Sequence, residues 1–285
     1  MTLIDGKSIS AKVKEEIKSV ASNLAAKGVE PALAVILVGE DAASKTYVAS
    51  KEKACAACGI RSVAHRLSSD VSEAALLELI ENLNEDESID GILVQLPLPK
   101  HIDTNKILEK ISLQKDVDGF SAINVGKLTS GLSDGFVPCT PLGVMRLLEE
   151  YGVQIAGKNA VVLGRSNIVG KPMASLLLNA DATVTIAHSK TKNLKQLCAD
   201  ADILVAAVGR AHFVGVDMVK QGAVVIDVGI NRGEDGKLRG DVDFDAVAPK
   251  CSFITPVPGG VGPMTIAMLL SNTIKSAKNR LKQRA

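Results

Sequence analysis

The chain has few aromatic side chains and no excess of either charge. Its 285 residues include no tryptophan and two tyrosines, and 33 basic residues against 32 acidic ones give a net charge of +1. Proteins that bind a nucleic-acid backbone normally gather positive charge on one face, so the even balance argues against nucleic acid as a partner. The length suffices for one large domain or two ordinary ones.

Long apolar runs and paired cysteines are also missing. No apolar stretch approaches the ~20 residues that span a bilayer, and the segment MTLIDGKSIS has no apolar signal core. The five cysteines are odd in number and scattered, which argues against a secreted disulfide framework. Cys55 and Cys58 form a CxxC without a second pair, so we interpret them as helix packing and predict no metal site. These absences predict a cytoplasmic protein with no membrane partner.

Short runs rich in Val and Ile alternate with helix-period segments through almost the whole chain. The helical segments include 72–86 and 141–152. Short continuous apolar runs are typical of buried parallel strands, so the alternation predicts the α/β class. The expected strands are 32–38, 62–67, 91–97, 159–164, 182–188, 203–209 and 223–229.

The clearest break in this rhythm is GFVPCTPLG at 135–143, where two prolines and two glycines precede a helix. We predict a smaller N-terminal α/β substrate domain, 1–139, and a Rossmann-like, doubly wound dinucleotide-binding domain, 140–267. The segment 268–285 is expected to form a helix that packs back on the first domain. Ligands favour domain interfaces and the carboxyl ends of parallel strands, so the expected site is a cleft between two lobes.

The glycine-containing turn VVLGRSNIVGKPMASLLL, at 161–178, runs from an expected strand into an expected helix. Gly164 permits a tight turn, Ser166 allows close approach of a ligand, and Gly170 lets the helix start against the sheet. Backbone N–H groups at such a helix start favour a phosphate. The spacing is one residue longer than the usual dinucleotide fingerprint, so the strand–turn–helix context carries the prediction, and a purely structural turn stays the alternative.

The end of the next strand indicates which dinucleotide is bound. A site for NAD usually has an acidic residue there, but this strand ends in His188, Ser189 and Lys190, and Arg165 lies in the preceding turn. Hydroxyl and cationic donors suit a 2′-phosphate, which predicts NADP. The alternative is that Lys190 and Lys192 form only a solvated strand end.

The segment SKTYVASKEKACAACG, at 44–59, places Tyr47 and Lys51 on one face of an expected helix. Ser44 is expected as its N-cap and Gly59 as its stop. Read alone, a tyrosine and a lysine at this spacing form a common surface pair.

Polar residues elsewhere in the first domain change that reading. Gln95 interrupts the apolar run 91–97, and a buried amide must find partners. Asp116 and Asp118 come directly before a glycine turn, where Asp is also an ordinary turn residue. Together with Lys51, these residues predict a polar site at the ends of parallel strands.

The motifs together resemble the FolD family of bifunctional methylenetetrahydrofolate dehydrogenase/methenyltetrahydrofolate cyclohydrolases. The similarity covers essentially the whole chain, and several of the matching strings are long and specific. The matching strings, in the family's order, are YVASKEKACAACGI, GILVQLPLP, KDVDGF, PCTPLGV, VVLGRSNIVGKP, VVIDVGINR and TPVPGGVGPMTIAML.

The resemblance implies a homodimer of two-lobed subunits, with folate in the cleft and NADP on the second lobe. The implied reactions are oxidation of 5,10-methylenetetrahydrofolate to the methenyl compound and its hydrolysis to 10-formyltetrahydrofolate. By motif match, Lys51 is the catalytic lysine, Tyr47 its neighbour in the substrate site and Gln95 its partner, and Asp118 binds the pterin. The residues that would hold the cofactor are Gly164, Arg165, Ser166, Ser189 and Ile230.

The two reactions need different groups. Hydride transfer needs the nicotinamide close to the reacting carbon. The loop 255–263, with Pro258, Gly259 and Gly260, is expected beside the substrate, although its composition fits a structural connection equally well. Hydrolysis needs a proton acceptor, and Lys51 would lose its charge beside a cationic folate when partly desolvated.

Two other functions stay open. A two-lobed dehydrogenase of a hydroxy or amino acid would normally offer Arg or Lys to a carboxylate, and the set of Tyr47, Lys51, Gln95 and Asp118 fits a folate ring better. A non-catalytic NADP sensor is disfavoured by the intact lysine site.

Overall fold

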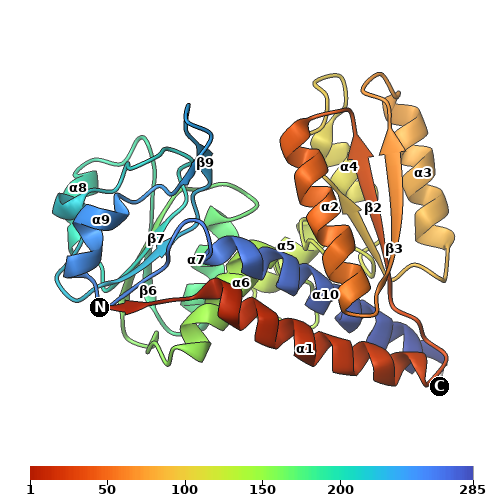
Figure 1. Ribbon diagram of the computed structural model, residues 1–285, viewed down its shortest axis with the longest axis horizontal. Helices are drawn as coiled ribbons and strands as arrows, with labels where there is room; N and C mark the ends of the chain where they lie inside the picture. Colours follow the sequence, from red (N-terminus) through yellow and green to blue (C-terminus); the bar gives the residue numbers. More distant parts are fainter. Residues whose placement is uncertain (285) are drawn as a thin grey trace. The chain divides into compact units, whose positions relative to one another are not determined.

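Two separate parallel sheets organise the chain in the computed structural model, which describes residues 1–284 (Figure 1). Each sheet belongs to one of two compact units of the chain. Both combine parallel strands with helices, which confirms the predicted α/β class. Unit 1 consists of Met1–Ala11, Leu128–Leu132 and Pro138–Thr265, and unit 2 of Lys12–Lys127, Ser133–Val137 and the residues from Ile266 onward.

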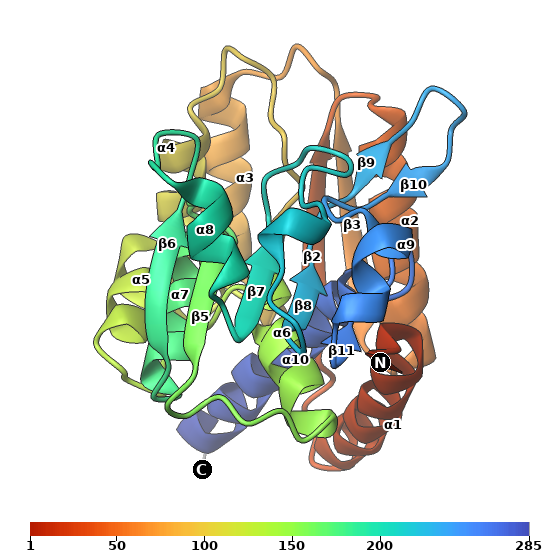
Figure 2. The same ribbon diagram turned by 90° about the vertical axis from the view of Figure 1, so that its left-hand side faces the viewer.

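Unit 1 contains a six-stranded sheet in the order β1-β11-β8-β7-β5-β6, and Figure 2 shows the part from β11 to β6. The strands β5, β6, β7 and β8 were predicted from the sequence, whereas β1 and β11 have only two residues each and were not. The order reverses on the two sides of β5, as in doubly wound folds. The strands are β1 (Thr2–Leu3), β5 (Asn159–Leu163), β6 (Thr183–Ala187), β7 (Ile203–Ala206), β8 (Val224–Asp227) and β11 (Phe253–Ile254).

The core of unit 1 follows from alternation along these strands. Val161 and Leu163 of β5 share one buried cluster with Leu204 of β7, together with Cys198 and Val247 from helices.

The other elements of unit 1 are helices and a short strand pair. The helices are α6 (Cys139–Glu150), α7 (Gly170–Asn179), α8 (Leu194–Ala199) and α9 (Phe244–Val247), and the one-turn helices are η1 (Val216–Met218) and η2 (Ala248–Lys250). Strand β9 (Asn231–Arg232) pairs with β10 (Leu238–Arg239).

Unit 2 contains a three-stranded sheet in the order β3-β2-β4, formed by β3 (Arg61–Leu67), β2 (Ala32–Val38) and β4 (Gly91–Val94). All seven residues of the central strand β2 are buried. Its even-numbered residues join a core cluster with the apolar faces of α3 (Glu73–Glu85) and α4 (Thr104–Lys110). Its odd-numbered residues therefore point to the opposite face, and α2 (Ala42–Ala57) packs on β2 and β3.

The start of α2 differs from the prediction. The N-cap is Asp41, whose carboxylate accepts a hydrogen bond from the N–H of Ser44 at 2.7 Å, so Ser44 lies inside the first turn. Asp caps as well as Ser, and sequence alone does not separate two such candidates three residues apart. At the other end, Gly59 has a φ of 70° directly after the C-cap Cys58, so the predicted helix stop is confirmed.

Three helices contain residues of both units: α1 (Gly6–Ala25), α5 (Ala122–Thr129) and α10 (Val261–Arg284). Within unit 2, α10 contributes a row of polar side chains. The guanidinium of Arg280 binds the carboxylate of Asp90 with two hydrogen bonds of 2.7 and 2.9 Å, and that carboxylate is completely buried. Asp90 also accepts the N–H of Ala32, which ties the last helix to the start of β2.

All five cysteines are free and buried. Burial raises the pKa of the Cys55 thiol to about 12, so this residue packs α2 and stays protonated. Within residues 1–284, no group of three or more His, Cys, Asp or Glu side chains is arranged to hold a metal ion. Of the helices in this range, none has both the length and the apolar character needed to traverse a bilayer.

Candidate active site

The predicted catalytic lysine and its predicted partner are in contact within unit 2. Nζ of Lys51, on α2, donates a hydrogen bond of 2.9 Å to Oε1 of Gln95. Gln95 is the first residue after β4, which ends at Val94, so the strand is shorter than the predicted run 91–97. Its N–H donates to Ile36 at 2.8 Å, and its Nε2 donates to the carbonyl of Leu96 at 2.7 Å. These two bonds fix the amide with its oxygen toward the amine.

The charge around Lys51 matters for its chemistry. Its partner Gln95 is a neutral amide, which stabilises an ammonium less than a carboxylate would. The acidic neighbour in the sequence, Glu52, forms an ion pair with Arg66 at 2.6 Å. Tyr47 lies one turn earlier on the same helix face and is 42% exposed. The lysine site is therefore half-buried, with an exposed aromatic ring on the same face of α2.

Asp118 lies on a loop that a second carboxylate organises. Asp116 is buried and accepts the N–H of Phe120 at 3.2 Å and of Ser121 at 2.9 Å, and the amide of Asn124 at 2.8 Å. On the other side, Asn272 of α10 donates to the carbonyl of Val117 at 2.8 Å. The backbone on both sides of half-buried Asp118 is thus held in place.

The predicted glycine turn of unit 1 requires both of its glycines. A Cβ on Gly164, whose φ is 127°, would lie 2.2 Å from the carbonyl oxygen of Ala207, and one on Gly170 would lie 2.3 Å from that of Gly164. The hydroxyl of Ser166 accepts the N–H groups of Val169 and Gly170 at 3.2 and 3.3 Å. Ser166 therefore satisfies two of the donors at the start of α7.

A cavity of about 270 Å³ lies at the carboxyl ends of β5, β6 and β7. It contains three of the predicted cofactor residues, Gly164, Arg165 and Ser189, and none of the acidic side chains described in residues 1–284 lines it. A mixture of apolar wall, guanidinium and hydroxyl donors fits a nucleotide with a phosphate group. The lining residues are Leu163, Gly164, Arg165, His188, Ser189, Leu194, Ala207, Val208, Arg210 and Phe213.

The remaining predicted residues lie elsewhere in unit 1. Ile230 follows β8 and is 44% exposed, and a Cβ on Gly262, at the start of α10, would lie 3.7 Å from its Cδ1. Gly259 accepts a hydrogen bond from the N–H of Lys7 at 3.0 Å, and a Cβ on Gly260 would lie 2.6 Å from the carbonyl oxygen of Pro256. The φ of 106° at Gly259 and the close approach of the Pro256 carbonyl to Gly260 therefore explain both glycines, and the neighbouring Pro258 is exposed.

Sequence reasoning missed a carboxylate that shapes the cavity wall. Asp241 is completely buried and accepts the N–H groups of Val208, Gly209 and Arg210 at 2.6, 2.9 and 2.8 Å. It also accepts the amide of Asn231 at 2.9 Å. The three backbone donors are 31 to 33 residues away from Asp241 in the chain, so no short sequence motif predicts these hydrogen bonds.

A second buried carboxylate supports the first. Asp227, at the end of β8, accepts the N–H groups of Gly229, Asp241 and Val242, each at 2.9 Å. Burial raises the pKa of Asp227 to about 6, and the nearby charge of Asp241 acts in the same direction.

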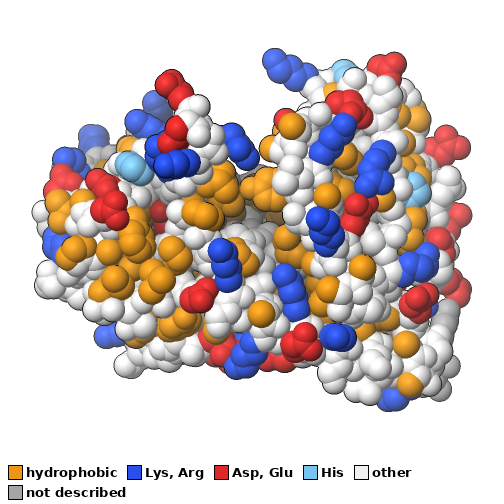
Figure 3. Space-filling view, in the orientation of Figure 1, with side chains coloured by type: hydrophobic (Ala, Val, Ile, Leu, Met, Phe, Trp, Pro, Cys, Tyr) orange, Lys and Arg blue, Asp and Glu red, His pale blue; other side chains and the backbone are white. Residues whose placement is uncertain are grey.

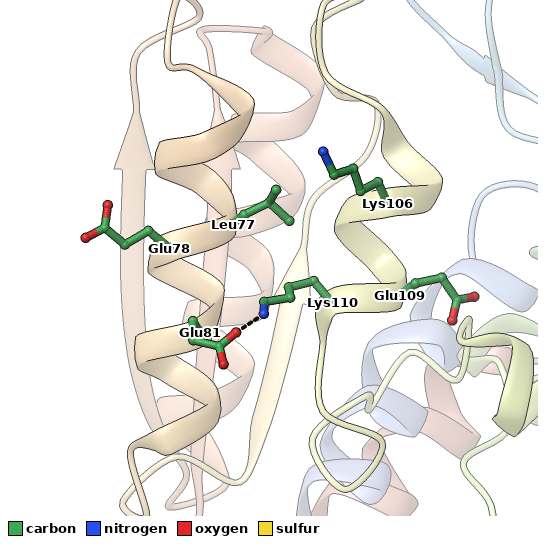
Figure 4. A pocket seen from close by; sticks show the side chains of 6 residues that line it. All are labelled: Leu77, Glu78, Glu81, Lys106, Glu109 and Lys110. Atoms are coloured by element: carbon green, nitrogen blue, oxygen red, sulfur yellow. Dashed lines mark ion pairs between the residues drawn. The ribbon is translucent and has the colours of Figure 1, made fainter.

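A larger hollow, of about 600 Å³, lies between α3 and α4 of unit 2 and contains none of the predicted residues (Figure 4). Its two lysines are in ion pairs, Lys110 with Glu81, as Figure 4 shows, and Lys106 with Glu73 at 2.5 Å. The cationic groups of the hollow are therefore already bound by carboxylates. On the face drawn in Figure 3, basic side chains lie singly among acidic ones rather than in one patch.

Comparison with known proteins identifies the family of this chain. Residues 4–118 match the model of the tetrahydrofolate dehydrogenase/cyclohydrolase catalytic domain, and residues 138–281 match that of the NAD(P)-binding domain of the same enzymes. The chain belongs to the tetrahydrofolate dehydrogenase/cyclohydrolase family. It is therefore a bifunctional enzyme of one-carbon folate metabolism, and the predictions of family, fold and a nicotinamide dinucleotide cofactor are confirmed.

Individual members of the tetrahydrofolate dehydrogenase/cyclohydrolase family are similar over nearly the full length. The bifunctional protein FolD of Campylobacter hominis is 72% identical over 283 residues, which cover 99% of each chain. The crystal structure of the Campylobacter jejuni FolD enzyme is 59% identical, with a TM-score of 0.97 over 98% of this chain and 99% of that one. The Trypanosoma brucei enzyme, solved with NADP cofactor and an inhibitor, is 42% identical, with a TM-score of 0.95 over 100% and 99%.

Proposed function

We propose that Lys51 handles the proton of the cyclohydrolase reaction, that Gln95 orients it and Tyr47 lies beside the substrate, and that Asp118 binds the pterin of the folate. The observation that carries this proposal is the 2.9 Å hydrogen bond from Lys51 Nζ to Gln95 Oε1. The bond fixes the amine at the end of a buried parallel strand, where ligand sites of α/β units are usually found.

The chemistry of hydrolysis explains the need for an amine there. Oxidation leaves a methenyl carbon between two nitrogens, and this group carries a positive charge. Water that attacks this carbon must lose a proton, and a free lysine, with a pKa of ~10.4, would be unable to accept it at neutral pH. A neighbouring cation and partial desolvation both disfavour the ammonium. Lys51 is thereby neutral in the substrate complex and acts as the general base, since Gln95 adds no negative charge.

Asp118 contributes binding. A carboxylate accepts two hydrogen bonds from the amine and ring N–H of an aminopyrimidine, which is the edge that a pterin presents. The loop that holds Asp118 is fixed by Asp116 and Asn272, so little rearrangement is needed when the substrate binds.

The cofactor is NADP, held by Gly164, Arg165, Ser166, Ser189 and Ile230, with the loop at Pro258, Gly259 and Gly260 beside the substrate. NADP bound by these residues would supply the hydride acceptor for oxidation of the methylene carbon of the folate. Two features support NADP over NAD: the cavity contains arginine side chains and no carboxylate, and the Trypanosoma brucei relative was solved with NADP.

The experiment that tests the lysine is the variant Lys51→Met. Hydrolysis of methenyltetrahydrofolate should fall by about 100-fold or more, the usual contribution of a general base, while the affinity for NADP stays unchanged. Lys53→Met is the matched control, since it removes the same charge from an exposed position two residues along α2 that faces another direction. Full hydrolysis by Lys51→Met would contradict the assignment.

We propose further that the enzyme acts as a homodimer in the cytoplasm. Strand β3 forms one edge of the sheet in unit 2 and pairs only with β2 among the described strands, which leaves the N–H and C=O groups of its other side without a strand partner. Such an edge suits pairing with a second copy. Sedimentation should give twice the 29.8 kDa chain mass, and a species of 29.8 kDa at micromolar concentration would contradict the dimer. The five free cysteines support a reducing compartment.

A further inference from the structure

The dinucleotide cavity contains two guanidinium groups, of which only one belongs to the glycine turn. Arg165 comes from the turn after β5, and Arg210 comes from the loop after β7. Both are exposed, and neither guanidinium forms a hydrogen bond or ion pair with another side chain described in residues 1–284. Ten N–H donors in fixed planar groups are therefore available to a ligand at this end of the sheet.

The backbone of Arg210 is held from inside the unit. Its N–H donates to Oδ1 of Asp241 at 2.8 Å, and the two preceding N–H groups donate to Oδ2 of the same carboxylate. Asp241 in turn donates its own N–H to Asp227. A buried charge with four donors is costly to move, so the Cα of Arg210 has one position relative to β7.

The side chain of Arg210 is held as well. Its guanidinium lies over the ring of Phe213, 4.8 Å from the ring centroid, and Phe213 also lines the cavity. The N–H of Phe213 donates to the carbonyl of Arg210 at 3.3 Å, which closes the turn that carries both residues. A cation over a ring keeps all of its N–H donors, which lie in the guanidinium plane, and so stays able to bind an anion.

We propose that Arg210 is a specificity-determining residue that binds the 2′-phosphate of NADP together with Arg165. This inference rests on the proposed function, in which NADP is the cofactor. The diphosphate of a dinucleotide belongs at the start of the helix after the first strand, here α7, whereas the adenosine ribose belongs at the end of the second strand, here β6. Arg210 shares its cavity with His188 and Ser189 of that strand end, which places it at the ribose.

The test is a titration calorimetry series on the full-length enzyme with NADP, NAD and adenosine 2′,5′-bisphosphate. In Arg210→Met, the affinities for NADP and for the bisphosphate should fall about tenfold, the size of one charge-assisted contact, while that for NAD changes less than about twofold. Arg239→Met removes the same charge from the same unit outside the cavity, where the side chain binds Asp235, and should leave all three affinities unchanged. Arg210→Lys should recover part of the loss, because it keeps the charge without the planar group.

Each of the other outcomes would refute either the role of Arg210 or the identity of the cofactor. Equal weakening of NADP and NAD by Arg210→Met would assign the residue to the diphosphate and overturn the proposal. Unchanged affinities would also overturn it, while leaving NADP as the cofactor. Failure of the wild-type enzyme to bind NADP or the bisphosphate would instead refute the proposed cofactor itself.

Discussion

Asp116 in unit 2 and Asp241 in unit 1 perform the same structural task over very different chain distances. Each is a buried carboxylate that accepts backbone N–H groups of a loop beside a candidate site. Asp116 holds Phe120 and Ser121, four and five residues further along the chain. Asp241 holds residues more than thirty positions earlier, after β7.

The difference explains why the sequence indicates one of these loops and not the other. A carboxylate that binds its own neighbours creates a short pattern, and KDVDGF is visible as one. A carboxylate that binds a remote loop leaves two unremarkable segments in the sequence, and only folding brings them together. The loop with Arg210 is therefore as firmly held as the loop with Asp118, although only the second was predicted.

The largest expected effect comes from removing the remote carboxylate. Asp241→Ala leaves three backbone N–H groups and the amide of Asn231 without their acceptor, which should lower the free energy of unfolding by on the order of 4 kcal/mol. Urea unfolding measures it, and Asp245→Ala, at an exposed position of α9, is the control. A loss no greater than that of the control would show that the loop is held by other contacts.

Removal of Asp116, which binds its own neighbours in the chain, should lower the stability nearly as much. Asp116→Ala removes the acceptor of two backbone N–H groups and of the Asn124 amide, at an expected cost of about 3 kcal/mol of stability. Because Asp118 then loses its fixed position, the KM for the folate should rise while the affinity for NADP stays constant. A change confined to NADP would break the assignment of this loop to the substrate.

Stability should depend on pH through Asp227. Burial raises the pKa of this carboxyl in the folded state to about 6 from 3.8, so the folded protein holds the proton more tightly than the unfolded chain. Its contribution to stability is complete below pH ~4 and falls by about 3 kcal/mol as the pH rises through ~6. The stability of wild type minus that of Asp227→Asn, measured from pH 4 to 7, isolates the contribution of Asp227. A flat difference would mean that the three N–H donors to Asp227 offset its burial.

A smaller effect is expected at Gln95. In Gln95→Glu, a carboxylate replaces the amide beside Lys51 Nζ and stabilises the ammonium, so the pH at which hydrolysis reaches its maximum should rise and the rate at pH 7 should fall about tenfold. The pH profile of hydrolysis shows this, whereas a mere loss of packing would lower the rate equally at every pH. Gln95→Met supplies that comparison.

Periodicity was sufficient for the long elements and insufficient for the short ones. The strands β2, β5, β6, β7 and β8 contain four to seven residues, are mostly apolar and were predicted, while β1 and β11 contain two residues each and have no periodic signal. The strand predicted at 91–97 ends at Val94 in the structure. The N–H of Gln95 still binds the carbonyl of Ile36 on β2, so the backbone bonds to its neighbour for one residue beyond the end of β4. Arg210 was missed because its significance depends on Asp241 and Phe213, which no short pattern connects to it.

The variant Lys51→Arg tests most directly whether an uncharged amine meets the methenyl group. Arginine keeps a positive charge and can donate to Gln95, but it stays protonated and so is unable to accept a proton. Hydrolysis by Lys51→Arg should therefore be as slow as by Lys51→Met, with binding of NADP and folate retained. A rate close to that of the wild-type enzyme would contradict the role of Lys51 as a base.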